Sequence, residues 1–282
     1  MDEYAAIPSQ VQKHSTQWHS HMLLTGASIV VTFALASTAT AERTFTIFNQ
    51  CSYTIWPAIF TDLNVGSAVP QQARGWEQPS ANVTHFQVPD NWVSGRIWAR
   101  HGCDFSNGGT GPETCLTGGC NGGLECDPHT GTGIPPATLA EFTLGINGAA
   151  DSYDVSVVDG HNIPMKIETN QNCPVAECAA DLVAGCPEPL ASPKDANGNT
   201  VGCKTACSAG LSGYVNSPDC CSGNFSTPAT CPSSGVQYYS YFKGKCPRSY
   251  AYAFDESSGT ALWSCDATLK ADYTITFCPE SS

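Results

Sequence analysis

Four ionisable side chains fall outside the predicted core of this sequence. Glu141 and Asp154 lie in runs that alternate apolar and polar residues, and alternation places both on the face away from the apolar side chains. Arg96 lies in a third such run, and Asp159 follows at an Asp-Gly pair where a bend is expected. If these strands are neighbours, their outer faces form an acidic surface that contains one arginine. Clustered carboxylates raise the pKa of one member, which suits that member to general acid–base chemistry.

The elements that carry these side chains are predicted to be strands of an all-β sandwich or barrel. Short alternating runs recur along the chain, and each is bounded by Gly, Pro, Asn or Asp. One helix is expected at 234–243. We expect strands at 43–48, 53–58, 84–88, 96–100, 139–144, 153–158, 165–169, 250–254 and 273–277.

Two cysteine-rich segments interrupt the predicted sandwich. Segment 103–136 has dense glycine and no alternation, which predicts a small disulfide-tied loop domain. Segment 186–246 holds seven cysteines among Pro, Gly and Ser, which predicts a disulfide-rich loop and helix domain. The sandwich core is then built from 42–102, 137–185 and 247–282.

Composition excludes several classes of protein. The 282 residues are 41% hydrophobic, which is too apolar for a disordered chain and enough to bury a core. The 26 glycines and 19 prolines argue against a helical bundle. A net charge of −13 makes nucleic acid a poor partner, whereas a neutral polysaccharide remains open.

The 16 cysteines indicate disulfides and an oxidising compartment. Zinc is disfavoured because the sequence has no C-x-x-C pair, and the adjacent Cys220 and Cys221 are poorly spaced for one tetrahedral ion. Spacing alone leaves the connectivity open. We expect no metal and no cofactor.

Residues 1–41 are predicted to be an N-terminal extension followed by a secretory signal peptide at 22–41. The apolar run that begins at Met22 ends at Ala39-Thr40-Ala41, the small-x-small pattern of a cleavage site, and is too short to span a membrane. The alternative is a buried helix of the mature fold. Two sequons, at Asn82 and Asn224, predict glycosylation on an extracellular route. We therefore expect a secreted monomer, extracellular or in a cell wall, with no membrane span.

The sequence resembles the thaumatin-like proteins, a family that includes osmotins and other antifungal proteins, and we expect a fungal-type secreted member. The resemblance covers about residues 42 to 282. It is carried by TFTIFN at 44–49, GRIWAR at 95–100, PPATLAEF at 135–142, YDVSVVDG at 153–160 and YTITFCP at 273–279, together with the order of the sixteen cysteines.

The resemblance implies a mainly β protein: a thaumatin-like β-sandwich, a disulfide-rich loop and helix domain, and a small disulfide-tied loop domain. It also implies eight pairs of cysteines, which would make the fold resistant to heat and proteases. The implied pairs are Cys51–Cys278, Cys103–Cys115, Cys120–Cys126, Cys173–Cys265, Cys178–Cys246, Cys186–Cys203, Cys207–Cys220 and Cys221–Cys231.

The family's cleft motif of one Arg, one Glu and three Asp falls on Arg96, Glu141, Asp154, Asp159 and Asp255. All five residue types are kept. Two departures occur nearby: the family's Thr-Gly-Asp-Cys has glycine at 119, which is expected to loosen a turn or an ion pair, and the family's aromatic after Asp-Gly is histidine at 161, which is expected to alter the cleft wall.

Members of this family bind β-1,3-glucans and some hydrolyse them, so the resemblance implies an endo-β-1,3-glucanase. Glycoside hydrolysis needs two carboxyl groups, one of them protonated. Our hypothesis makes Glu141 the general acid and Asp159 the nucleophile or base, with Arg96 holding the carboxylates and Asp154 and Asp255 orienting sugar hydroxyls. Activity would then be highest in acid. The alternative is a non-enzymatic antifungal protein that perturbs walls or membranes.

Aromatic and histidine residues are weaker candidates. A tryptophan of a sandwich usually packs in the core, but alternation places Trp98 beside Arg96, where it could stack on sugar. Trp56, Trp76 and Trp92 are expected in the core. His101 and His129 have no ligand partner at a suitable spacing, whereas His161 neighbours Asp159.

Overall fold

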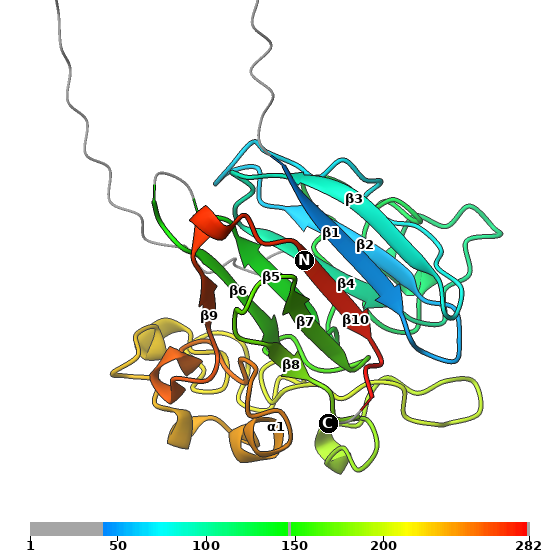
Figure 1. The fold of residues 1–282 in the computed structure, drawn as a ribbon. Coiled ribbons are helices and arrows are strands. Elements are labelled where there is room, and N and C mark those ends of the chain that lie inside the picture. Colours follow the sequence, from blue (N-terminus) through cyan, green and yellow to red (C-terminus); the bar gives the residue numbers. More distant parts are fainter. Residues whose placement is uncertain (1–41, 146–147, 281–282) are drawn as a thin grey trace, which may run out of the picture. The chain divides into compact units, whose positions relative to one another are not determined.

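The structure is a computed structural model that describes residues 42–145 and 148–280. Two β-sheets form the core of this part of the chain, and irregular segments with short helices extend from them (Figure 1). The predicted signal peptide and the extension before it lie outside the described residues. The predicted domain boundaries within 42–282 stay a prediction.

Ten strands are described, together with one α-helix of seven residues, α1 (Tyr239–Lys245). Six short 3-10 helices occupy the connections. The strands are β1 (Glu42–Asn49), β2 (Trp56–Thr61), β3 (Val83–Pro89), β4 (Gly95–Arg100), β5 (Leu139–Thr143), β6 (Asp151–Ser156), β7 (Met165–Thr169), β8 (Ala176–Cys178), β9 (Trp263–Cys265) and β10 (Tyr273–Phe277). The 3-10 helices are η1 (Pro112–Thr114), η2 (Glu188–Leu190), η3 (Gly223–Phe225), η4 (Ser233–Gly235), η5 (Asp255–Ser258) and η6 (Ala267–Leu269).

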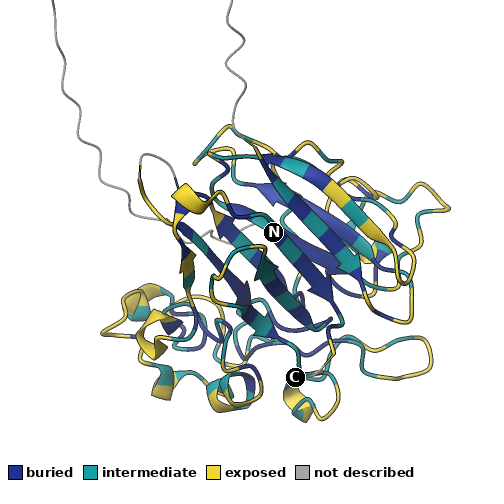
Figure 2. Ribbon diagram, viewed as in Figure 1, coloured by how far each residue is buried: buried dark blue, intermediate teal, exposed yellow. Residues whose placement is uncertain are grey.

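Each sheet has five strands. The first has the order β3-β1-β10-β7-β8, with β1 and β10 parallel and the other pairs antiparallel. The second has the order β2-β4-β5-β6-β9 and is antiparallel throughout. Burial alternates along β1, as expected of a strand with one face on the core (Figure 2).

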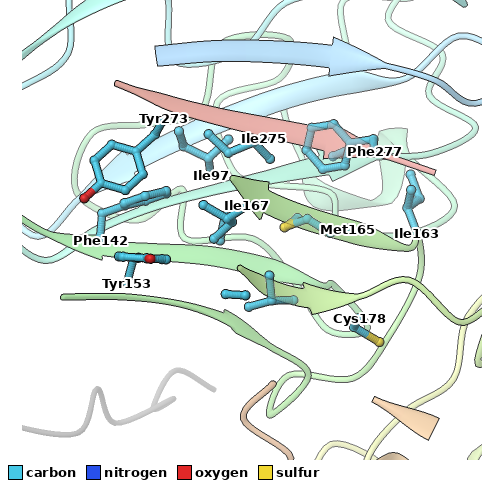
Figure 3. Packing of buried hydrophobic residues seen from close by; sticks show 14 of the residues in the cluster. Ile97, Phe142, Tyr153, Ile163, Met165, Ile167, Cys178, Tyr273, Ile275 and Phe277 are labelled. Atoms are coloured by element: carbon cyan, nitrogen blue, oxygen red, sulfur yellow. The ribbon is translucent and has the colours of Figure 1, made fainter. Parts of the chain in front are cut away.

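The core lies between the two sheets. Tyr273 and Ile275 of the first sheet pack in one cluster with Ile97, Phe142 and Tyr153 of the second (Figure 3). The predicted inward positions on β4, β5 and β6 are therefore confirmed, because these strands carry apolar residues at every second position.

The sixteen cysteines form eight disulfides, and the described chain has no free cysteine. The bonds join the pairs that the family resemblance implies. They are Cys51–Cys278, Cys103–Cys115, Cys120–Cys126, Cys173–Cys265, Cys178–Cys246, Cys186–Cys203, Cys207–Cys220 and Cys221–Cys231.

The structure differs from the predicted elements in several places. The strand expected at 250–254 is absent from this described segment, because Tyr250 makes one isolated bridge to Ser156 before the chain turns into η5. The expected helix at 234–243 is η4 followed by α1, which begins five residues later at Tyr239. The three-residue strands β8 and β9 were not predicted, since so short a run shows no periodicity.

Candidate functional site

Three of the predicted site residues lie side by side across the second sheet. Arg96 of β4 is paired with Glu141 of β5, and Glu141 is paired with Asp154 of β6. Directly opposed residues of antiparallel strands have Cβ atoms about 4.5–5.5 Å apart, on the same face. The acidic surface predicted from alternation is thus formed by strand register.

Arg96 also reaches the fourth residue. Its Nη2 lies 3.3 Å from a carboxylate oxygen of Glu141, and its Nη1 lies 3.9 Å from one of Asp159. The three side chains are 29%, 33% and 37% exposed, respectively, so solvent or a ligand can reach them. One guanidinium therefore holds two accessible carboxylates, which we call the acidic cluster together with Asp154.

Asp154 is the buried member of the acidic cluster. Its residue exposure is 8%, and its Oδ1 has no hydrogen-bond partner among the described residues. Burial, with added repulsion from Glu141 and Glu256 and an opposing effect of Arg96, raises the pKa of Asp154 well above its ordinary value. Asp154 therefore holds a proton at a pH where an exposed aspartate would have lost it.

Asp159 titrates in the same direction. Burial and the charge of Glu141 raise the pKa of Asp159, and Arg96 opposes them. The backbone supports this position, because the Asp159 carbonyl accepts a hydrogen bond of 3.2 Å from the Ala137 N–H. Asp154 and Asp159 thus both bind a proton more tightly than an exposed aspartate does.

Asp255 is placed differently from the other four residues. It is fully buried, and its carboxylate accepts hydrogen bonds from the Tyr239 hydroxyl (2.8 Å), Lys243 Nζ (2.9 Å) and the Ala251 N–H (2.9 Å). This burial argues against a direct contact between Asp255 and a sugar hydroxyl. Its bonds instead fix the segment that leads into η5.

Tyr250 and Glu256, which were not predicted as site residues, interact electrostatically with the acidic cluster. Glu256 raises the pKa of Asp154, and Asp154, Glu256 and Glu141 each raise the pKa of Tyr250 after the larger effect of its burial. The predicted strand at 250–254 gave no indication of this, because such a strand would have directed the chain past the cluster.

Trp98 is not a sugar-stacking residue, contrary to its predicted exposure. It is fully buried, and its indole N–H donates a hydrogen bond of 2.7 Å to the Gly118 carbonyl. It packs with Cys120 and Cys126, since the segment predicted as the small loop domain covers this part of β4. Trp92 lies in the core, and Trp56 and Trp76 are half-buried.

Both departures from the family motif lie in the interior. His161 is fully buried, so it does not form the wall of an open site. Its Nδ1 lies 3.2 Å from Thr138 Oγ1, while its Nε2 has no partner in the described chain. A Cβ at Gly119 would lie 1.8 Å from the Pro112 carbonyl oxygen, so this backbone has no room for the family's aspartate.

Two surface hollows are described, and neither is lined by the acidic cluster. One of about 210 Å³ lies beside Ile59, Leu63 and Val69, and one of about 300 Å³ lies beside Ile134 and Lys204.

Other predicted surface features can be placed. Asn82 and Asn224 are both exposed, so their side chains are accessible for glycosylation. Within residues 42–145 and 148–280, no helix is long and apolar enough to cross a bilayer, and no group of three or more His, Cys, Asp or Glu side chains is arranged to hold a metal ion.

Comparison with known proteins finds a family match over most of the chain. Residues 49–279 match the Thaumatin family. Thaumatin-like protein 1 of Arabidopsis thaliana is 41% identical over 280 residues, covering 94% of this chain and 97% of that protein. Pathogenesis-related thaumatin-like protein 3.5 of Cryptomeria japonica is 38% identical, covering 90% and 98%.

A solved structure shares the fold at low identity. The GH family 64 laminaripentaose-producing β-1,3-glucanase of Paenibacillus barengoltzii matches with a TM-score of 0.50 and 12% identity, covering 84% of this chain and 75% of that protein. The expectation of a fungal-type member stays a prediction.

Proposed function

Because the chain belongs to the thaumatin family, we propose that it is a secreted endo-β-1,3-glucanase. It binds β-1,3-glucan at the acidic cluster and cleaves glycosidic bonds within the glucan chain. The observation that carries this proposal is the Arg96 guanidinium, which lies within ion-pair distance of both Glu141 and Asp159 on an accessible surface. Eight disulfides suit a protein that works outside the cell.

The roles follow from exposure. Glu141 and Asp159 are the accessible carboxyls, so they are the pair that can flank a glycosidic bond, with Glu141 as acid and Asp159 as nucleophile or base. Arg96 holds the two in place. Asp154 and Asp255 are buried, so in this proposal they position the site without touching the sugar.

The direct test is Glu141→Gln with linear β-1,3-glucan. The change removes the transferable proton but keeps the shape of the side chain, so release of reducing sugar should fall by about a hundredfold or more. Glu188→Gln, an equal charge change at an exposed residue, is the matched control and should leave the rate unchanged. Equal rates for wild type and Glu141→Gln would overturn the assignment of Glu141.

The second candidate is a defence-type protein that binds walls or membranes without hydrolysis. One observation favours it: the Cryptomeria japonica relative is named a pathogenesis-related protein. Pull-down on insoluble β-1,3-glucan, followed by sizing of the soluble products, separates the two candidates. Retention of the wild-type protein without soluble products supports this second candidate, and retention with products supports hydrolysis.

A further inference from the structure

Tyr250 is attached to the strand that carries Asp154. Its backbone N–H donates a hydrogen bond of 2.9 Å to the Val155 carbonyl, and its carbonyl accepts one of 2.9 Å from the Val157 N–H. These bonds fix the Tyr250 backbone beside the end of β6. The half-buried Tyr250 hydroxyl forms a side-chain hydrogen bond with Glu256, and it also interacts electrostatically with Asp154 and Glu141.

The segment after Tyr250 is fixed as well. The buried Asp255 carboxylate accepts the Ala251 N–H and the Lys243 ammonium, each at 2.9 Å. Glu256 follows directly in η5 and is exposed. The anchor at Asp255 therefore determines where the Glu256 side chain leaves the backbone.

Asp154 has an excess of negative neighbours. Glu141 faces it from the adjacent strand β5, and Arg96 lies beyond Glu141 on β4. Glu256 and Tyr250 interact with it from the segment that follows α1. Arg96 is the one cation among these groups, and it is shared between Glu141 and Asp159. An ionised Asp154 would place a further negative charge in the interior, with its Oδ1 unpartnered.

We propose that Tyr250 and Glu256 are positioning residues of the acidic cluster. The Tyr250 hydroxyl holds the Glu256 carboxylate beside the acidic cluster, where it adds a negative charge near the buried and unpartnered Asp154 carboxyl. The two accessible carboxyls, Glu141 and Asp159, then lie next to an uncharged Asp154. This inference relies on the proposed function only for its effect on hydrolysis, because the protonation of Asp154 can be measured without a substrate.

The test is Glu256→Gln in the full chain, with Asp154 followed by carboxyl ¹³C NMR during a pH titration and assigned by its loss in Asp154→Asn. Removing one charge several Å away should reduce the proton affinity of Asp154 about threefold. Glu188→Gln is the matched control, because Glu188 is exposed and is not among the groups that act on Asp154. An unchanged titration in Glu256→Gln, or an equal shift in both variants, would overturn the role of Glu256.

The part played by Tyr250 needs a double-mutant cycle. If Tyr250 holds Glu256 in place, Glu256→Gln should shift the pKa of Asp154 by less than half as much in a Tyr250→Phe background as in wild type. An equal shift in both backgrounds would overturn the role of Tyr250 and leave that of Glu256 intact.

The consequence for hydrolysis is a separate readout. If wild type releases reducing sugar, Glu256→Gln should move the alkaline limb of the pH–rate profile to lower pH, because the cluster titrates as a coupled group. Absence of hydrolysis in wild type would contradict the proposed function. The NMR titration would still show whether Glu256 affects the protonation of Asp154.

Discussion

The sandwich contains two arginine–carboxylate clusters, one around Arg43 and one around Arg96. Each includes an aspartate of β6, and the two aspartates lie on opposite faces of that strand. Arg43 is fully buried and forms ion pairs with Asp90 at 2.5 Å and Asp151 at 2.8 Å. Arg96 is 29% exposed, and its ion pairs with Glu141 and Asp159 are longer, at 3.3 and 3.9 Å. Asp151 begins β6 on the core face, and Asp154 lies three residues later on the other face.

The two clusters differ in the balance between positive and negative side chains. At the first, Arg43 and Lys270 face Asp90 and Asp151, and the Tyr273 hydroxyl donates a further bond to Asp151. Burial alone would raise the pKa of Asp90, but hydrogen bonds from Lys270 and Arg43 bring that pKa below its ordinary value. At the acidic cluster, burial comes first and an excess of negative charge adds to it, so the pKa of Asp154 rises instead. Asp90 of the balanced cluster therefore loses its proton more readily than an exposed aspartate, whereas Asp154 of the unbalanced cluster holds its proton more tightly.

A third arginine, Arg100, is fully buried and has no ion pair with a carboxylate in the described chain. Its guanidinium donates to the carbonyls of Gly123 (2.9 Å), Leu124 (2.8 Å) and Trp56 (3.0 Å). Burial lowers the pKa of Arg100 to about 10. Neutral carbonyls thus take the place of a counter-charge.

Arg43→Met should have the largest effect on stability. It leaves Asp151 fully buried without its ion-pair partner, and breaking a buried pair in this way typically costs about 3–5 kcal/mol. Denaturant unfolding at neutral pH with the disulfides intact measures the loss. A loss below about 1 kcal/mol would contradict the contrast drawn between the two clusters.

His161→Phe should change the stability of the protein in acid. Burial lowers the pKa of His161 to about 4, from 6.5 for a free side chain. The unfolded chain therefore takes up the proton first, and stability is lost as pH falls from 6.5 to about 4, by about 3 kcal/mol in total.

The phenylalanine variant should lack this loss, and unfolding series at pH 7, 5 and 4 would show it. His129→Phe, at an exposed position, is the control and should keep the wild-type dependence. Parallel pH curves for wild type and His161→Phe would contradict the prediction.

Asp154→Asn should change how stability depends on pH in the opposite sense to His161→Phe. Because the pKa of Asp154 is raised in the fold, its contribution to stability is complete below about 3.8 and is lost as pH rises through the folded pKa. The loss is at most about 1.4 kcal/mol for each pH unit in that window.

The asparagine variant should therefore gain stability relative to wild type as pH rises. Measuring unfolding free energies of both proteins from pH 3 to 8 tests the sign. A difference that stays constant with pH would show that the Asp154 carboxyl titrates normally in the fold.

The strands and the inward residues could be predicted from the sequence because alternation is a local signal. Ile97, Phe142 and Tyr153 all lie between the sheets as expected. The pairing of the cysteines could not be derived from spacing and came from the family resemblance.

What alternation could not predict is which outer residues other segments cover. Trp98 and Arg100 share a face with Arg96, but the chain around Gly118 and Gly123 covers both and leaves Arg96 exposed. The same limit applies to Asp154, which faces away from the core and is buried nonetheless. Long-range packing of irregular segments decides these positions, and such segments carry no periodicity.

Arg96→Met, the same substitution as at Arg43, should have the smallest effect on stability. Exposed ion pairs contribute about 0–1 kcal/mol, so the unfolding free energy should change by less than about 1 kcal/mol. The chemistry should respond more strongly, because Arg96 is the group that opposes the rise in the pKa of Asp159. A ¹³C titration should therefore show the pKa of Asp159 moving upward in this variant. An unmoved Asp159, or a loss of stability as large as that of Arg43→Met, would show that the two clusters do not differ as argued.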